Sequence, residues 1–252
     1  MKDMLKKNFS KEVMHVLAIS DFYQLLAISL RLPDHDLAQG MLDGSYGQDA
    51  VNILQELYCD EEKIAEVKKL FAKLSLNAKL SLNAKLSSND ELSLSKDKVT
   101  SFLIEMRREY TRLFDNPKNP ALSIYETVFL HDPEEEKEEL MLFMSPAALD
   151  AERCYKEAGV SLVKQSSEPA DHMATELEFM MYLYAKKGQV LQEGNEEAFN
   201  LINKQIKEFH KLHLNKWALD FFKKLQAEAK LLPYQGIAQI GIIGLGKVLE
   251  KE

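Results

Sequence analysis

The stretch EPADHMATELEFM, residues 168–180, is the part of the sequence around which the rest can be arranged. It places two acids, a proline and a histidine at the start of a long amphipathic segment. Apolar residues then recur at the spacing of one helix face, at Met173, Leu177, Met180, Met181 and Tyr184. Proline is tolerated in the first turn of a helix, where Asp171 can accept a hydrogen bond from a free backbone N–H. The stretch therefore predicts a capped helix from about Pro169 to Lys187 that ends at Gly188. The alternative is a polar cluster at the mouth of a groove.

The composition of the whole chain favours helices. Its 252 residues include only 10 glycines and 7 prolines, whereas Leu, Lys, Glu and Ala, which form helices readily, are abundant. No segment shows the alternation of a half-buried strand. Capping residues and helix breakers divide the chain into about nine to eleven helices. We expect an all-α fold, a helical bundle that forms a single domain over residues 1–252.

Charge and cysteine usage exclude several classes of protein. The net charge of −8 argues against nucleic acid as a main partner. Cys59 and Cys154 lack the spacing of a zinc knuckle or a disulfide framework. The N-terminus is charged and does not resemble a secretory signal. The longest apolar run, Ile237 to Leu249, contains glycines and is too short for a bilayer. We expect a cytoplasmic protein without stable membrane insertion.

A short internal repeat interrupts the helical pattern. The sequence KLSLNA at residues 73–78 recurs at 79–84 and, in degraded form, at 85–90. A period of six residues fits neither a helix nor a solenoid. We interpret residues 73–95 as a repeat-containing insertion or loop between two helices, with a β-hairpin or a helix extension as alternatives.

Residues 168–176 also contain candidate metal ligands. Glu168, Asp171, His172 and Glu176 could hold a metal ion, since His172 and Glu176 are one helical turn apart. A second histidine at motif spacing is missing, which weakens this interpretation. The same residues could form an acid/base pair, but the sequence has no nucleophile motif for it to serve.

Two other patterns are better explained by packing. His210 and His213, with Trp217 beyond them, suit the meeting of two helices at a corner. The run GIIGLGK at residues 241–247 formally matches a phosphate-binding loop, but no strand precedes it and Val248 replaces the required Ser or Thr. Its glycines suit close helix packing.

Three stretches together resemble the TorD/DmsD family of redox-enzyme maturation chaperones. The first is EYTRLF at residues 109–114, followed by Pro117, Pro120 and YETV at 125–128. The second is the EPADH…ELEFM stretch itself. The third is HLNKWALDF at residues 213–221, with Tyr234 beyond it. These stretches occur in the family's order and span about residues 100 to 240.

The resemblance implies a TorD-like, all-helical chaperone that is not an enzyme and has no cofactor. Such proteins bind the twin-arginine leader, the body, or both, of the apo catalytic subunit of a molybdopterin-dependent oxidoreductase of the DMSO-reductase type. They assist cofactor insertion and proofread export. The matching positions imply a peptide-binding region made of Glu168, Pro169, Asp171, His172, Glu176, Tyr125 and Glu126. Acids there can pair with leader arginines, and methionine and aromatic side chains can accept an apolar segment.

The sequence departs from the family in two places. Ala170 stands where many relatives have a second proline, and the repeat has no counterpart. The nitrate-reductase branch differs in its central segment, so the TorD/DmsD branch is the nearer likeness. The alternatives are a metal-dependent enzyme that uses His172 with Glu168, Asp171 and Glu176, and a nucleotide-binding switch at the glycine-rich end. The client, and the choice between a monomer and a domain-swapped dimer, stay open.

Overall fold

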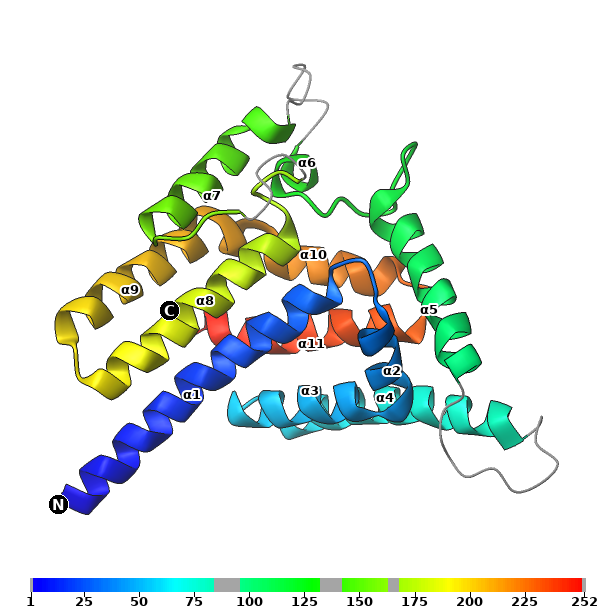
Figure 1. Cartoon of the computed structure of the whole chain (residues 1–252), viewed down its shortest axis with the longest axis horizontal. Helices are drawn as coiled ribbons and strands as arrows, with labels where there is room; N and C mark the ends of the chain where they lie inside the picture. Colours follow the sequence, from blue (N-terminus) through cyan, green and yellow to red (C-terminus); the bar gives the residue numbers. More distant parts are fainter. Residues whose placement is uncertain (1, 84–95, 132–141, 163–167, 251–252) are drawn as a thin grey trace.

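The computed structural model describes residues 2–83, 96–131, 142–162 and 168–250. In these ranges the chain is helical and has no strand, apart from an isolated bridge between Tyr125 and His172 (Figure 1). This confirms the all-α prediction. The helices are α1 (Lys2–Ser29), α2 (His35–Asp43), α3 (Ser45–Glu56), α4 (Glu61–Asn83), α5 (Lys96–Tyr110), α6 (Glu126–Leu130), α7 (Pro146–Glu157), α8 (Met173–Glu193), α9 (Glu196–Phe209), α10 (Asn215–Glu228) and α11 (Leu232–Leu249). Two π-helical turns, η1 (Thr111–Asp115) and η3 (His210–Leu214), and a 3₁₀ turn, η2 (Leu142–Met144), complete them.

The helices α1 and α8 form the central antiparallel pair (Figure 1). Ser20 Oγ of α1 donates a hydrogen bond of 2.9 Å to the carbonyl oxygen of Met181 in α8. Gly188 lies farther along this interface, where a Cβ atom would be only 2.7 Å from Leu17 Cδ2. Gly188 therefore allows close approach inside α8 and does not end it. The helix ends at Gly194, whose φ of +68° is the left-handed conformation typical of a C-cap glycine. The predicted end at Gly188 was wrong.

The helix α11 crosses the core between this pair and the α3–α4 pair (Figure 1). It is continuous through residues 241–247, so this run has no phosphate-loop conformation. A Cβ at Gly241 would collide with the ring of Phe222, and one at Gly244 with the ring of Phe22. Both rings are fully buried. Close helix packing is therefore confirmed as the role of these glycines.

The internal repeat begins within a helix. The first copy, residues 73–78, and most of the second continue α4 as far as Asn83. Leu74 of the first copy is buried. Residues 73–83 are thus a helix extension and not a loop, while residues 84–95 lie outside the described residues.

The C-terminal half holds the signature stretch against the core. Ser145 caps α7, since its Oγ accepts a hydrogen bond from the N–H of Ala148 at 3.1 Å. The helices α9 and α10 are joined by the π-helical turn η3, and His210 and His213 lie buried in that turn. Among the helices of the described residues, none is long and apolar enough to cross a membrane.

Candidate functional site

The signature stretch pairs with residues that lie far away in the sequence. The N–H of Met173 donates to the carbonyl oxygen of Ile124 at 2.9 Å, and the N–H of Glu126 donates to that of Asp171 at 3.0 Å. The two motifs around Tyr125 and His172 therefore form one local structure.

Asp171 stabilises this pairing from within the protein. Its side chain is fully buried, and Oδ2 accepts hydrogen bonds from the backbone N–H of Thr127, at 2.9 Å, and from the Thr127 hydroxyl. Asp171 thus caps the start of α6 and not its own helix, contrary to the sequence prediction. Burial raises the pKa of Asp171, and the Thr127 hydrogen bonds oppose that rise.

His172 is the residue that caps α8. Its Nδ1 accepts a hydrogen bond from the N–H of Ala174 at 3.1 Å, and its ring meets the ring of Tyr125 edge-on. Burial, together with the positive charge of Arg31, lowers the pKa of His172 to about 3. His172 is therefore a neutral, buried cap. Pro169 is buried and precedes the helix, outside the first turn in which it was expected.

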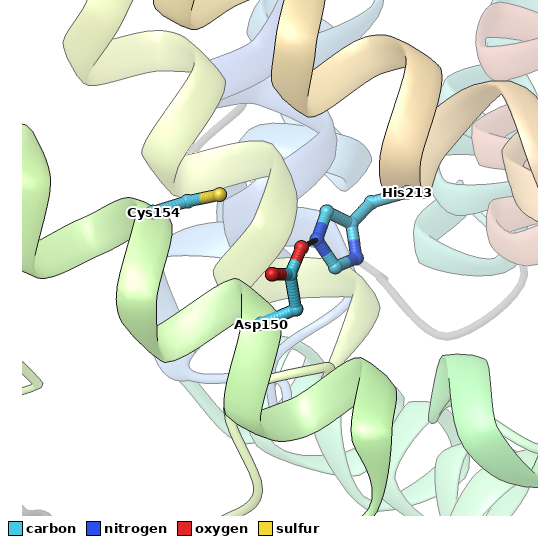
Figure 2. A group of neighbouring side chains, drawn as sticks. All are labelled: Asp150, Cys154 and His213. Atoms are coloured by element: carbon cyan, nitrogen blue, oxygen red, sulfur yellow. Dashed lines mark hydrogen bonds and ion pairs between the residues drawn. The ribbon is translucent and has the colours of Figure 1, made fainter.

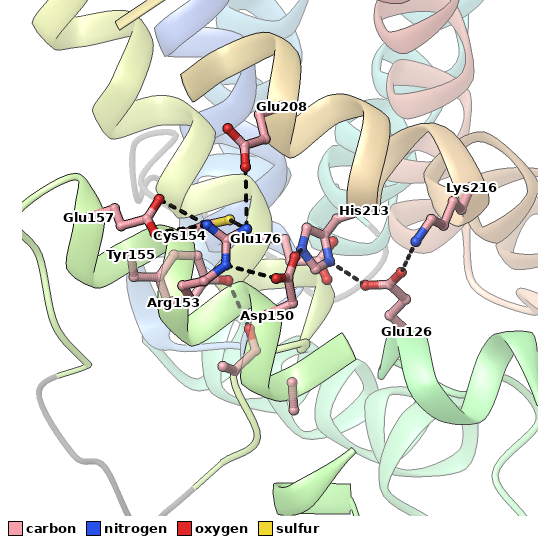
Figure 3. Close-up of polar contacts among 12 residues, drawn as sticks. Glu126, Asp150, Arg153, Cys154, Tyr155, Glu157, Glu176, Glu208, His213 and Lys216 are labelled. Carbon is pink, nitrogen blue, oxygen red and sulfur yellow. Dashed lines mark hydrogen bonds and ion pairs between the residues drawn. The ribbon is translucent and has the colours of Figure 1, made fainter. Parts of the chain in front are cut away.

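Behind these residues lies a buried polar network (Figure 3). His213 contacts Glu126 Oε2 through Nδ1 at 2.7 Å and Asp150 Oδ2 through Nε2 at 3.2 Å. Glu176 Oε2 accepts a hydrogen bond of 3.1 Å from Trp217 Nε1. Burial and the adjacent charge of Glu126 raise the pKa of Glu176 well above its usual value, which favours the protonated form of this carboxyl group.

Arg153 joins this network to the surface of α7. Its guanidinium donates to Asp150 at 2.9 Å, to Glu157 at 2.9 Å and to Glu208 at 3.3 Å (Figure 3). The hydrogen bond from Arg153 is the main reason that the pKa of Asp150 is lowered. One guanidinium thus connects α7 with α9, since Asp150 and Glu157 lie on α7 and Glu208 lies on α9.

Two groups in the network have metal-ligand chemistry. One is Asp150, Cys154 and His213, which face one another across α7 and η3 (Figure 2). The other is Glu126, Glu176 and His213. In each group the donor atoms lie within 4.8 Å of one another. In the first group, Arg153 already donates to Asp150 Oδ1 at 2.9 Å and to Cys154 Sγ at 3.5 Å. Among the described residues neither group contains His172, so the metal set expected from the sequence is not assembled.

An open pocket of about 450 Å³ lies beside the network, on the outer face of α8. Its walls are mainly apolar, and they include Tyr155, Val160, Leu162, Phe179, Met181 and Tyr182. Polar residues also line it, namely Arg31, Ser161, Glu168, Thr175 and Glu178. The side chains of Glu168 and Glu178 are 44% and 59% exposed, and their carboxylates pair with Arg31 at 2.8 Å and 3.1 Å. We call this the α8 pocket.

Comparison with known protein families shows to which family the chain belongs. The model described as "Nitrate reductase delta subunit" matches residues 78–223. The chain belongs to this family. The nitrate reductase delta family comprises redox-enzyme maturation chaperones that act on molybdoenzymes, which confirms the resemblance to this chaperone family and supports a chaperone role. The nearer likeness to the TorD/DmsD branch stays a prediction. A search of the curated proteins finds no match to the chain.

The structure of this family member places the expected site residues in three different environments. Glu168 and Pro169 line the α8 pocket. Asp171, His172, Glu126 and Glu176 are at most 2% exposed and hold the fold around it. Tyr125 is half-buried and contacts His172. The pocket residues Arg31, Glu178 and Tyr182 were not expected. The sequence could have indicated that Glu178 is exposed. Of the two acids in the helical part of the stretch, Glu176 and Glu178, Glu178 lies farther from the apolar helix face.

Proposed function

We propose that this chain is a cytoplasmic chaperone that binds the twin-arginine leader of a molybdopterin-dependent oxidoreductase of the DMSO-reductase type. Family chaperones bind molybdoenzyme subunits, and the finer proposal concerns the leader. The chaperone holds the apo catalytic subunit during cofactor insertion and delays export until insertion is complete. It acts as a monomer or as a domain-swapped dimer, and light scattering at several concentrations distinguishes the two.

The observation that carries the proposal is the combination of acids and apolar walls in the α8 pocket. Glu168 and Glu178 present accessible carboxylates, which suit the planar, always-charged guanidinium of arginine. Phe179, Met181 and Tyr182 provide an apolar wall beside them. A leader offers the same combination, since its arginines precede an apolar segment. A pocket of about 450 Å³ accommodates a few side chains, so it suits a short segment of the leader.

The buried acids have a supporting role in this proposal. Asp171 and His172 fix the start of α6 and the start of α8, while Tyr155 donates a hydrogen bond of 2.8 Å to the carbonyl oxygen of Ala170. These contacts hold Glu168 and Pro169 at the edge of the pocket. The residues implied by the family resemblance thus contribute in two ways, by direct contact and by positioning.

Calorimetry with a synthetic leader tests the proposal. We expect arginine-dependent binding to the full chain, with loss of binding when both leader arginines are changed to alanine. The single variants Glu168→Gln and Glu178→Gln should each weaken binding by roughly three- to tenfold. A matched control, Asp220→Asn, removes one acid from an exposed ion pair on α10 and should leave the affinity unchanged. Equal binding of the arginine-free leader would refute the proposal.

A further inference from the structure

The arginine site of the α8 pocket is already occupied by a residue of the chain itself. Arg31 lies just beyond the end of α1, and its guanidinium reaches across to the α8 pocket. Nη1 donates to Glu168 Oε2 at 2.8 Å, and Nη2 donates to Glu178 Oε2 at 3.1 Å and to Thr175 Oγ1 at 2.9 Å. Three acceptors from two segments therefore converge on one guanidinium.

We propose that Arg31 is an internal competitor that occupies, in the free chaperone, the place that a leader arginine takes in the complex. This inference rests on the proposed function. The acceptors that hold Arg31 are the accessible acids to which the leader is assigned. Two carboxylates and a hydroxyl form a cradle for a planar, forked donor, and they do not distinguish an arginine of the chain from one of a bound peptide.

The contacts of Arg31 are suited to exchange. The side chains of Arg31, Glu168 and Glu178 are 38%, 44% and 59% exposed, so water screens their ion pairs. Exposed ion pairs contribute little net stability, which makes it easy for Arg31 to swing into solvent. A leader arginine then restores the same charge pairing, and its neighbouring apolar residues add contacts that Arg31 does not make.

Competition of this kind also provides selectivity. A peptide without arginine must leave the acids unpaired once it displaces Arg31, whereas a twin-arginine leader does not. Lysine carries the charge but lacks the fork, so it replaces Arg31 only in part. Arg31 thus excludes apolar segments in general from the α8 pocket and lowers the apparent affinity for the correct one.

Calorimetry on the variant Arg31→Gln tests the inference. We expect it to bind the twin-arginine leader roughly three- to tenfold more tightly than the wild type, because the competitor is gone. The leader with both arginines changed to alanine should also bind to the Arg31→Gln variant more tightly than it binds to the wild-type protein. Lys223→Gln is the control, since it removes one positive charge from an exposed ion pair with Asp220 on α10. It should show no gain, and thermal unfolding should confirm that both variants are folded.

A second measurement follows Arg31 directly. In the ¹⁵N-labelled chaperone, the Arg31 side-chain Nε–H signal is identified by its absence in Arg31→Gln. We expect it to shift on titration with the twin-arginine leader and not with the alanine leader.

The outcomes separate the inference from the proposed function. If the wild type binds the leader through its arginines and Arg31→Gln shows equal or weaker binding, Arg31 is not a competitor and the function stands. If neither protein binds the leader, both proposals fail. A gain shared by the Lys223→Gln control would reduce the effect to overall charge and overturn the inference.

Discussion

Individual acids of the signature stretch have different environments that the sequence does not distinguish. Helical spacing correctly predicted that Met173, Leu177, Met180 and Tyr184 face inward, and each is at most 1% exposed. Met181, on the same predicted face, is only partly buried and lines the α8 pocket. It could not predict that Asp171 caps α6, because the N–H that it accepts from belongs to Thr127, 44 positions away. Capping by a distant residue leaves no periodic pattern.

His172 should make the protein sensitive to acid. Its pKa is about 3 in the folded protein against an ordinary value of 6.5, so the unfolded chain takes up a proton first as the pH falls. Its contribution is complete above pH 6.5 and decreases towards the folded pKa by at most about 1.4 kcal/mol per pH unit. His172→Asn keeps a capping acceptor without a titrating group. Urea unfolding at several pH values should therefore show a flatter pH dependence for the variant, and parallel curves would contradict this assignment.

Glu176 should have the opposite pH dependence. Its pKa is raised well above 4.5, so the folded protein keeps the proton that the unfolded chain loses as the pH rises through that value. The free energy of unfolding therefore decreases with rising pH. Glutamine resembles the neutral carboxyl and still accepts from Trp217, so Glu176→Gln should gain stability over the wild type at about pH 8 relative to about pH 5. Thermal unfolding at both pH values measures this. No gain at pH 8 relative to pH 5 would mean that the pKa of Glu176 is not raised in the folded protein.

At the scale of the helix, the starts and ends of helices were predicted well where neighbouring residues in the sequence determine them. The pair Ser145-Pro146 correctly marked the start of α7. Gly188 was misread as a helix end, because a glycine that stops a helix and one that admits a neighbouring side chain look alike in sequence. Only the position of Leu17 on α1 distinguishes them.

Two glycines of α11 provide a matched test of close packing. A Cβ at Gly244 meets the buried Phe22 ring, whereas a Cβ at Gly246 has no neighbouring atom within 4 Å. Gly244→Ala should reduce the free energy of unfolding by about 1–3 kcal/mol through overpacking. Gly246→Ala should increase it by up to about 1 kcal/mol, since alanine favours helix. Denaturant unfolding measures both, and similar effects at the two positions would argue against a tight α1–α11 contact.

For the whole molecule, composition and motifs predicted the all-α class and the family, but not the location of the open surface. The α8 pocket brings Arg31, which carries no motif, to the signature stretch only because α1 and α8 run antiparallel. That pairing depends on contacts between distant residues, which periodicity within one segment does not report.

Leader binding should depend strongly on salt. The chain carries a net charge of −8 and presents two accessible acids at the α8 pocket. Because salt screens exposed charges, raising NaCl from about 0.05 M to about 0.5 M should weaken binding by roughly tenfold. The double variant Glu168→Gln/Glu178→Gln should bind more weakly and respond less to salt. An equal salt response of the two proteins, measured by calorimetry, would place the charged contacts elsewhere.

The burial of Asp171, His172, Glu126 and Glu176 bears on how client preference diverges among chains with this architecture. Residues that hold the scaffold can be exchanged only at a cost in folding, so these four shared residues identify the scaffold and say little about the client. Other residues of the pocket wall, at positions 160–162 and 182, belong neither to this scaffold nor to the acids assigned to the leader arginines, so they can vary in size and charge. Exchanging those positions between two such chaperones is therefore the expected route to a changed client with an unchanged fold.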